Sequence, residues 1–229
     1  MLGTGRTLNI STTFLMLSLQ ALLSLPRHEA QTSAVRFLST LVEAALVATS
    51  GQHRDLLAEQ RPAGELTIEE GLAIARDKAG SLMSLACRLG AMCAGAPETL
   101  DEQFADLGLS LGIAHQLNND CHDLAAELQH ESCTTTARTS HSFPLKTDLA
   151  RGKKTLPIIL AMHQGISLQK LQSSTDDEEQ QRIRAVLHVS IQQTWSLCLL
   201  YRERARNRMR EIEAQRAMPP ELHLLLGLE

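Results

Sequence analysis

The feature that most constrains the fold of this chain is a long aliphatic run at helical spacing over residues 99–128. Leu, Ile and Ala recur every three or four positions there, which is the pattern of an α-helix that buries one face. Gly108 and Gly112 lie four residues apart in this run, so a neighbouring helix can approach its backbone closely. Acidic residues interrupt the second half of the run, "LGIAHQLNNDCHDLAAEL" (residues 111–128), and they need an explanation.

The rest of the composition also favours helices. The chain has 229 residues, of which 43% are hydrophobic but only 3% aromatic, so the core must be aliphatic. The β-branched and aromatic residues that favour strands are few. We therefore expect an all-α fold in one domain spanning residues 1–229. The net charge of −4 and the lack of a basic stripe with interleaved aromatics disfavour nucleic-acid binding.

Capping signals and proline positions set the expected helix boundaries. Thr67 with Glu70, and Thr175 with Glu178, form capping boxes, and Pro157 suits the first turn of a helix. Gly51 marks either a helix end or a tight contact. The expected helices cover residues 8–25, 29–50, 68–94 and 99–128, a segment from 155 onward, and residues 175–215. The Ser-, Thr- and His-rich stretch at about 129–147 is expected to be a mobile loop.

Two features bear on the cellular compartment. The five cysteines are odd in number and lack CxxC spacing, which favours free thiols in a reducing cytoplasm. The apolar segment 8–25 follows Arg6 and resembles a weak signal peptide, but it has no small-x-small cleavage site. It is also too short and too polar for a stable membrane span. We expect a cytoplasmic protein.

The acidic residues of the long helix predict a metal site. Residues four apart share a helix face, so Asn119, Asp123 and Glu127 form a row with Asp120 beside it. Oxygen ligands without thiolate or imidazole favour Mg²⁺, which keeps several waters and completes its shell with phosphate oxygens. The alternative is an acidic face that points to solvent. The apolar flanks favour an inward face.

Cationic residues that would suit a diphosphate occur in two other segments. "DLARGKKTLPIIL" contains Asp148, Arg151, Lys153 and Lys154 ahead of an apolar helix, and lysine binds phosphate as a point charge. Lys78, in "ARDKAGSLMSLACRLGA", is followed by small and apolar residues. It either points into the bundle or is a surface lysine paired with a helical neighbour.

Together, four segments resemble the trans-isoprenyl diphosphate synthases, or polyprenyl synthetases. They are "GQHRDLLAE", "IARDKAGSLMSLACRLGA", "LGIAHQLNNDCHDL" and "DLARGKKTLPIILA". The corresponding family patterns read GQ-x-x-D-L, K-T-(small), F-Q-x-x-D-D-x-x-D and D-x-x-x-G-K-x-T-L-P. The order and spacing of all four agree, and the resemblance extends from about residue 1 to the C-terminus.

The resemblance implies an isoprenoid-synthase-type helical bundle around a central cavity. It further implies a Mg²⁺-dependent prenyltransferase that condenses an allylic prenyl diphosphate with isopentenyl diphosphate, commonly as a homodimer. Carried over residue by residue, the metal ligands are Asn119, Asp120 and Asp123. The catalytic residues that contact the allylic diphosphate are Lys78, Gln116 and Lys153.

This sequence departs from the family pattern at three points. Asn119 replaces the leading Asp of its motif, and Ala79 replaces the Thr that follows the lysine. No DDxxD or DDxxxxD motif occurs in the chain, so we expect the N-terminal helices of the bundle to be missing. One alternative is a non-catalytic or truncated subunit that pairs with a complete synthase. Another is a class I terpene cyclase-like enzyme, because Asn119, Asp123 and Glu127 match the i, i+4, i+8 spacing of its metal motif.

Overall fold

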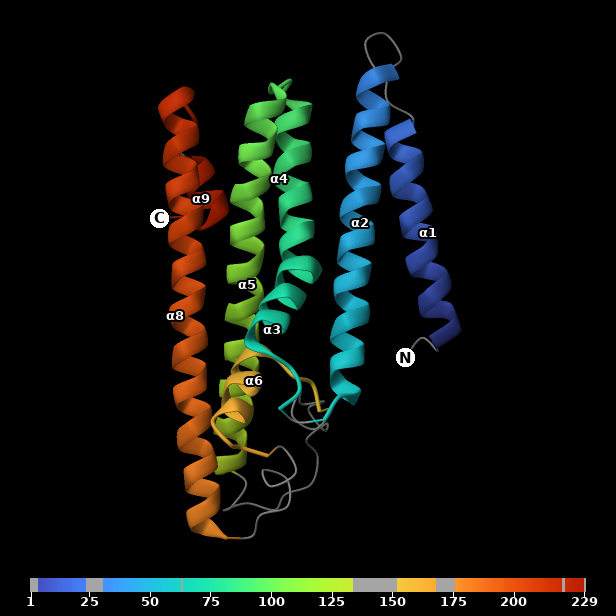
Figure 1. The fold of residues 1–229 in the computed structure, drawn as a ribbon. Coiled ribbons are helices and arrows are strands. Elements are labelled where there is room, and N and C mark those ends of the chain that lie inside the picture. Colours follow the sequence, from blue (N-terminus) through green and yellow to red (C-terminus); the bar gives the residue numbers. More distant parts are fainter. Residues whose placement is uncertain are drawn as a thin grey trace. The chain divides into compact units, whose positions relative to one another are not determined.

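In a computed structural model of the chain, every regular element among the described residues is a helix, so the expected all-α class is confirmed. The structure describes residues 4–23, 31–62, 64–133, 152–167, 176–219 and 221–228. The helices are α1 (Thr4–Leu23), α2 (Gln31–Gln60), α3 (Ile68–Ala75), the π-helix η1 (Arg76–Gly80), α4 (Ser81–Cys93), α5 (Glu98–Cys133), α6 (Leu156–His163), α8 (Asp177–Gln215) and α9 (Glu221–Leu226) (Figure 1).

Contacts divide the chain into two compact units, Met1–Leu46 and Val47–Glu229. The first unit holds α1 and the first half of α2. Its large apolar side chains are largely exposed, among them Leu8, Phe14, Val35 and Leu46. The second unit holds every residue discussed below as part of a site. That the chain forms a single domain over residues 1–229 stays a prediction.

Helix α5 is the centre of the second unit. It packs against α4 on one side and against α8 on another (Figure 1). Leu107, Leu117 and Cys121 on α5 are fully buried in three separate apolar clusters. The aliphatic core that the composition predicts is therefore organised along the long helix that also carries the acidic residues.

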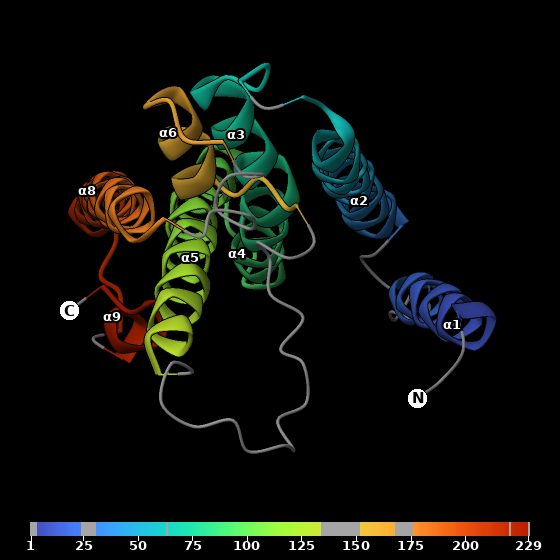
Figure 2. The ribbon, with the colours of Figure 1, turned by 90° about the horizontal axis from the view of Figure 1, so that it is seen from below.

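Helix α6 lies between α3 and α8 (Figure 2). Pro157 is in its first turn, as predicted, where the missing N–H has no helical partner. Ile158 and Ile159 are each 1% exposed, so this short helix is buried on several faces. That burial fixes the segment immediately before it, residues 153–155, against the bundle.

Several helix boundaries differ from those expected. The Thr67–Glu70 capping box is confirmed, with the Glu70 N–H donating to Thr67 Oγ1 at 3.1 Å. Helix α5 continues to Cys133, because Gln and Glu support helix beyond residue 128. The expected loop is therefore wrong for residues 129–133, and residues 134–147 lie outside the described residues. Thr175 also lies outside them, and the observed N-cap of α8 is Asp176, which accepts from the Glu178 N–H.

Gly51 makes a tight contact and does not end a helix. Helix α2 continues through it to Gln60, and a Cβ at Gly51 would lie 2.7 Å from the Lys78 backbone N. On the opposite side of η1, a Cβ at Gly112 would lie 2.7 Å from the Ala79 carbonyl oxygen. Both distances are below van der Waals contact, so η1 is held at backbone distance between α2 and α5. No motif in the sequence predicts the π-helix itself, although such turns are frequent at functional sites.

By length and composition, Ala34–Gln60 is the one candidate membrane span among the described residues. Core helices of bundles pass the same test, so the support is weak. The second half of this segment packs Gly51 against η1, which is the behaviour of a bundle helix.

Gly51→Ala should destabilise the protein by about 1–3 kcal/mol, since the added methyl group meets backbone atoms that cannot rotate away. Urea unfolding followed by circular dichroism measures the change. Gly90→Ala is the matched control, because Gly90 is a helical glycine with open space at its Cβ position. It should gain about 0.5–1 kcal/mol from helix propensity. Equal effects at both positions would contradict the close contact.

Candidate active site

Four of the six predicted site residues meet in one small pocket. Lys78 comes from η1, Gln116 and Asp120 come from α5, and Lys153 precedes α6. The remaining lining residues are Asp55, Gly71, Ile74, Ala75, Lys154, Thr155 and Leu156. The cavity volume is about 20 Å³, which is room for about one water. The polar side chains therefore fill this space and pair with one another.

Lys78 points into the bundle. Its Nζ lies 2.6 Å from Oδ2 of Asp55, and its side chain is 27% exposed. Asp55 is on α2, one turn beyond Gly51, so the glycine contact brings this carboxylate to the lysine. Asp55 belongs to the "GQHRDL" segment, yet the sequence assigned it no role. The motif indicates that Asp55 has a role, but the sequence does not show that its ion-pair partner is Lys78.

The π-helix that carries Lys78 is also clamped from α2. Asp77 precedes Lys78 and is buried, and its carboxylate accepts from Arg76 at 2.7 Å and from Arg54. Burial raises the pKa of Asp77, but the two arginines outweigh it and the net pKa is lowered. This carboxylate is therefore ionised in the folded protein and holds η1 against α2.

Asp120 is the buried carboxylate of the pocket. It is 6% exposed and accepts from Nε2 of Gln116 at 2.8 Å. Its pKa is raised to about 6, with burial as the main cause and Asp55 as a further one, while Gln116, Lys153 and Lys78 act in the opposite direction. The nearby positive charge does not fully compensate this carboxylate. A cation at the site would supply what is missing.

The other two predicted metal ligands lie elsewhere on the helix surface. Asn119 and Asp123 are exposed, and the Asn119 amide nitrogen lies 3.3 Å from Nε2 of His115. Glu127, which the sequence placed in the same row, is 8% exposed. Among the described residues, no group of three or more His, Cys, Asp or Glu side chains is arranged to hold a metal. Asp120 fits a Mg²⁺ ion that takes most of its ligands from water and phosphate.

Lys153 and Lys154, in the segment before α6, lie in different environments. Lys153 borders the pocket, where its charge acts on Asp120. Lys154 instead donates to three backbone carbonyls, so the idea that both lysines bind a diphosphate is wrong for Lys154. Thr155 lines the pocket with a buried hydroxyl that has no partner among the described residues. Asp148 and Arg151 lie outside those residues.

Comparison with known proteins identifies the family of this chain. A sequence profile described as "Polyprenyl synthetase" matches residues 1–189. This match covers well over half of the chain. The chain belongs to the polyprenyl synthetase family.

Individual relatives are similar over most of the chain. The geranylfarnesyl diphosphate synthase of Aeropyrum pernix is 29% identical over 198 residues, which are 84% of this chain and 58% of that protein. The octaprenyl diphosphate synthase of Haemophilus influenzae is 29% identical over 82% of this chain and 53% of its own length. The chain thus spans a little over half the length of these two relatives.

Solved structures share the fold. A polyprenyl synthetase from Streptomyces coelicolor A3(2) superposes with a TM-score of 0.73 at 21% identity, over 99% of this chain and 65% of that one. A decaprenyl diphosphate synthase from Rhodobacter capsulatus gives a TM-score of 0.62 at 22% identity, over 84% and 57% respectively. At these identities the likeness concerns the helical fold alone.

Asp120→Asn should stabilise the metal-free protein at pH 8 by on the order of 2–3 kcal/mol. The folded-state pKa is raised, so between 3.8 and about 6 the folded protein holds a proton that the unfolded chain has lost. Stability contributed by this group therefore falls as pH rises through that window, and the neutral amide removes the penalty. Urea unfolding at pH 4 and pH 8 measures the effect.

Asp123→Asn is the matched control for this prediction. It makes the same chemical change on the same helix, but Asp123 is exposed. Its stability should stay within about 0.5 kcal/mol of wild type at both pH values. A loss of stability at pH 8 in Asp120→Asn would contradict the uncompensated buried carboxylate.

Proposed function

We propose that this protein acts in isoprenoid biosynthesis as a prenyltransferase of the polyprenyl diphosphate synthase type. It binds an allylic prenyl diphosphate through Mg²⁺ and condenses it with isopentenyl diphosphate. The observation that carries the proposal is the convergence of Lys78, Gln116, Asp120 and Lys153, from three separate elements, in one pocket. These are the residues that the family pattern assigns to the diphosphate and the metal.

The charges of the pocket suit a diphosphate. Lys78 and Lys153 supply two ammonium groups, and Asp55 and Asp120 supply two carboxylates. A diphosphate oxygen can replace Asp55 as the partner of Lys78, because both are anionic acceptors of a charge-assisted hydrogen bond. Gln116 holds Asp120 from the same helix and keeps its carboxylate oriented. This exchange leaves the buried Asp55 carboxylate without Lys78, and a Mg²⁺ ion bound with the diphosphate would supply the compensating positive charge.

The same groups can assist departure of the diphosphate. Charge grows on the leaving oxygens as the carbon–oxygen bond breaks, and prepositioned cations in a water-poor site stabilise it. Lys78 and Lys153 are held in place for that task. Mg²⁺ bound by Asp120, with Asn119 and Asp123 as the proposed neighbouring ligands, would neutralise further phosphate charge. The allylic carbon would then bond to the isopentenyl double bond, and the resulting carbocation would lose a proton, which the departed diphosphate can accept.

A non-catalytic subunit that pairs with a complete synthase is the second candidate. The printed sequence contains no DDxxD or DDxxxxD motif, and in this candidate function another polypeptide supplies a second acidic wall for the metals. Exposed apolar residues such as Phe14 and Leu46 in the first unit are available for such a contact. The proposed assembly is a homodimer or a heterodimer with a complete synthase. We propose a cytoplasmic location, since the four described cysteines are free.

The terpene cyclase alternative has less support. Its metal motif would use Asn119, Asp123 and Glu127 together. Glu127, the residue specific to that motif, is buried and does not line the pocket. Asp120, which that motif does not use at this register, is the carboxylate in the pocket.

An allylic prenyl diphosphate with Mg²⁺ should raise the melting temperature of the protein, as measured by thermal shift. Asp120→Ala and Asp123→Ala should abolish the Mg²⁺-dependent part of this rise, because each removes an anionic metal ligand. Lys78→Ala should reduce the rise with and without Mg²⁺, because it removes a phosphate contact. Glu102→Ala, at an exposed carboxylate on the same helix, should change neither. Full Mg²⁺-dependent stabilisation in both aspartate variants would contradict the assignment of Asp120 and Asp123 as metal ligands.

Turnover separates the two candidate functions. The purified chain is incubated with labelled isopentenyl diphosphate, an allylic diphosphate and Mg²⁺, with and without a complete synthase. If the protein is an enzyme, the chain alone should form product, and Lys153→Ala should lower the rate of product formation by at least about 100-fold. Product only in the mixture, with Lys153→Ala as active as wild type there, would establish the subunit function in its place.

A further inference from the structure

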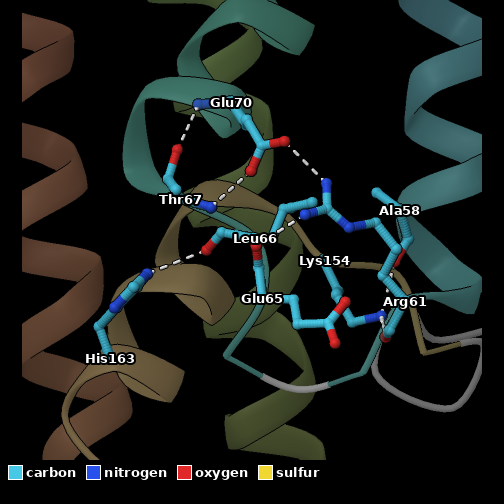
Figure 3. Close-up of polar contacts among 8 residues, drawn as sticks. All are labelled: Ala58, Arg61, Glu65, Leu66, Thr67, Glu70, Lys154 and His163. Atoms are coloured by element: carbon cyan, nitrogen blue, oxygen red, sulfur yellow. Dashed lines mark hydrogen bonds and ion pairs between the residues drawn. The ribbon is translucent and has the colours of Figure 1, made fainter.

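Lys154 is fixed in an unusual way for a lysine beside a phosphate site. Lys154 is 7% exposed, and its Nζ donates to the carbonyl oxygens of Ala58 and Arg61, each at 2.6 Å (Figure 3). A third bond runs to the carbonyl oxygen of Glu59 at 3.1 Å. An ammonium group has three N–H donors, and these three bonds use all of them. Lys154 therefore has no donor left for a phosphate.

The three carbonyls belong to the end of α2 and the residue that follows it. The last four carbonyls of a helix have no partner within the helix, and a cation there also interacts favourably with the helix dipole. Burying an ammonium group is costly unless its hydrogen bonds are made, so this geometry is tightly defined. Lys154 thus caps α2 from a segment nearly a hundred residues later in the chain.

This cap links two walls of the pocket. On one side, α2 carries Asp55, which lies one turn before Ala58 and pairs with Lys78. On the other side, the peptide of Lys154 is joined directly to Lys153, which borders the pocket. The cap therefore holds the backbone of Lys153 at a set distance from the Asp55–Lys78 pair.

A second contact with the segment between α2 and α3 can be compared with the Lys154 contact. His163, in the last turn of α6, lies with Nε2 2.9 Å from the Leu66 carbonyl oxygen (Figure 3). This contact also joins the segment between α2 and α3 to the α6 region, but His163 does not line the pocket. If the role of Lys154 is purely structural, loss of the Lys154 contact and loss of the His163 contact should have the same effect on diphosphate binding.

We propose that Lys154 is a positioning residue for the diphosphate site. By capping α2 it sets where Lys153 lies relative to Asp55 and Lys78, and so determines the affinity of the pocket for a diphosphate. The inference deepens the proposed function and rests on it, since both concern the same pocket.

Four proteins test the proposal: wild type, Lys154→Met, Lys154→Arg and His163→Ala. Met keeps the apolar stem but has no donor, whereas Arg restores charge and donors. The first measurement is the Kd of inorganic diphosphate with Mg²⁺ by calorimetry. The second is amide hydrogen exchange at residues 153–160 and 58–62 without ligand. If Lys154→Met does not fold, Lys154→Gln, which keeps two donors, takes its place.

Lys154→Met should weaken diphosphate binding by about tenfold or more, because a small displacement of Lys153 misplaces its ammonium group. It should also accelerate exchange in both segments together. Lys154→Arg should restore most of the affinity. His163→Ala should lower the melting temperature but leave the Kd within about twofold of wild type.

Equal loss of affinity in Lys154→Met and His163→Ala would overturn the proposal, as would unchanged exchange at residues 153–160 in Lys154→Met. An absence of diphosphate binding in the wild type would instead overturn the proposed function. The exchange comparison still decides on Lys154 in that case, because it needs no ligand.

Discussion

The approach of α2 and α5 to the π-helix η1 at backbone distance is the constraint on which the pocket depends. A β-carbon at Gly51 or Gly112 would stand between the helices and move them apart. At the observed distance, Asp55 reaches Lys78 from the next turn of α2, and Gln116 and Asp120 reach the same space from the next two turns of α5. The charged groups meet because nothing larger than hydrogen separates the backbones.

Charge pairing within the pocket follows from this proximity. Lys78 pairs with Asp55, so its ammonium group has an anionic partner before any phosphate binds. Asp120 is less well satisfied, and its raised pKa reflects burial that the surrounding cations do not offset. A divalent cation beside Asp120 would offset its charge, and we expect it to favour binding of an anionic ligand at the neighbouring lysines.

Much of this could be predicted from the sequence, and the exceptions have physical causes. The helical class, the Thr67 cap and the position of Pro157 depend on residues close together in the sequence, and these predictions are confirmed. Adjacent residues on a helix differ by about 100° in direction, so periodicity alone could not say whether Asp120 or Asn119 faces the pocket. The acceptors of Lys154 lie more than ninety positions away, and no spacing rule connects residues at that separation.

Binding and turnover are separable in a site of this construction. In the proposed function, the two lysines, Gln116 and Asp120 would recognise the diphosphate together with its metal. Leaving-group departure would need more, because developing charge must be met by metal ions held on both sides of the phosphates. The printed sequence contains one acidic motif of this kind, and Asn119 lowers its charge. We therefore expect that another acidic wall would affect the rate of the reaction far more than the affinity for the allylic diphosphate.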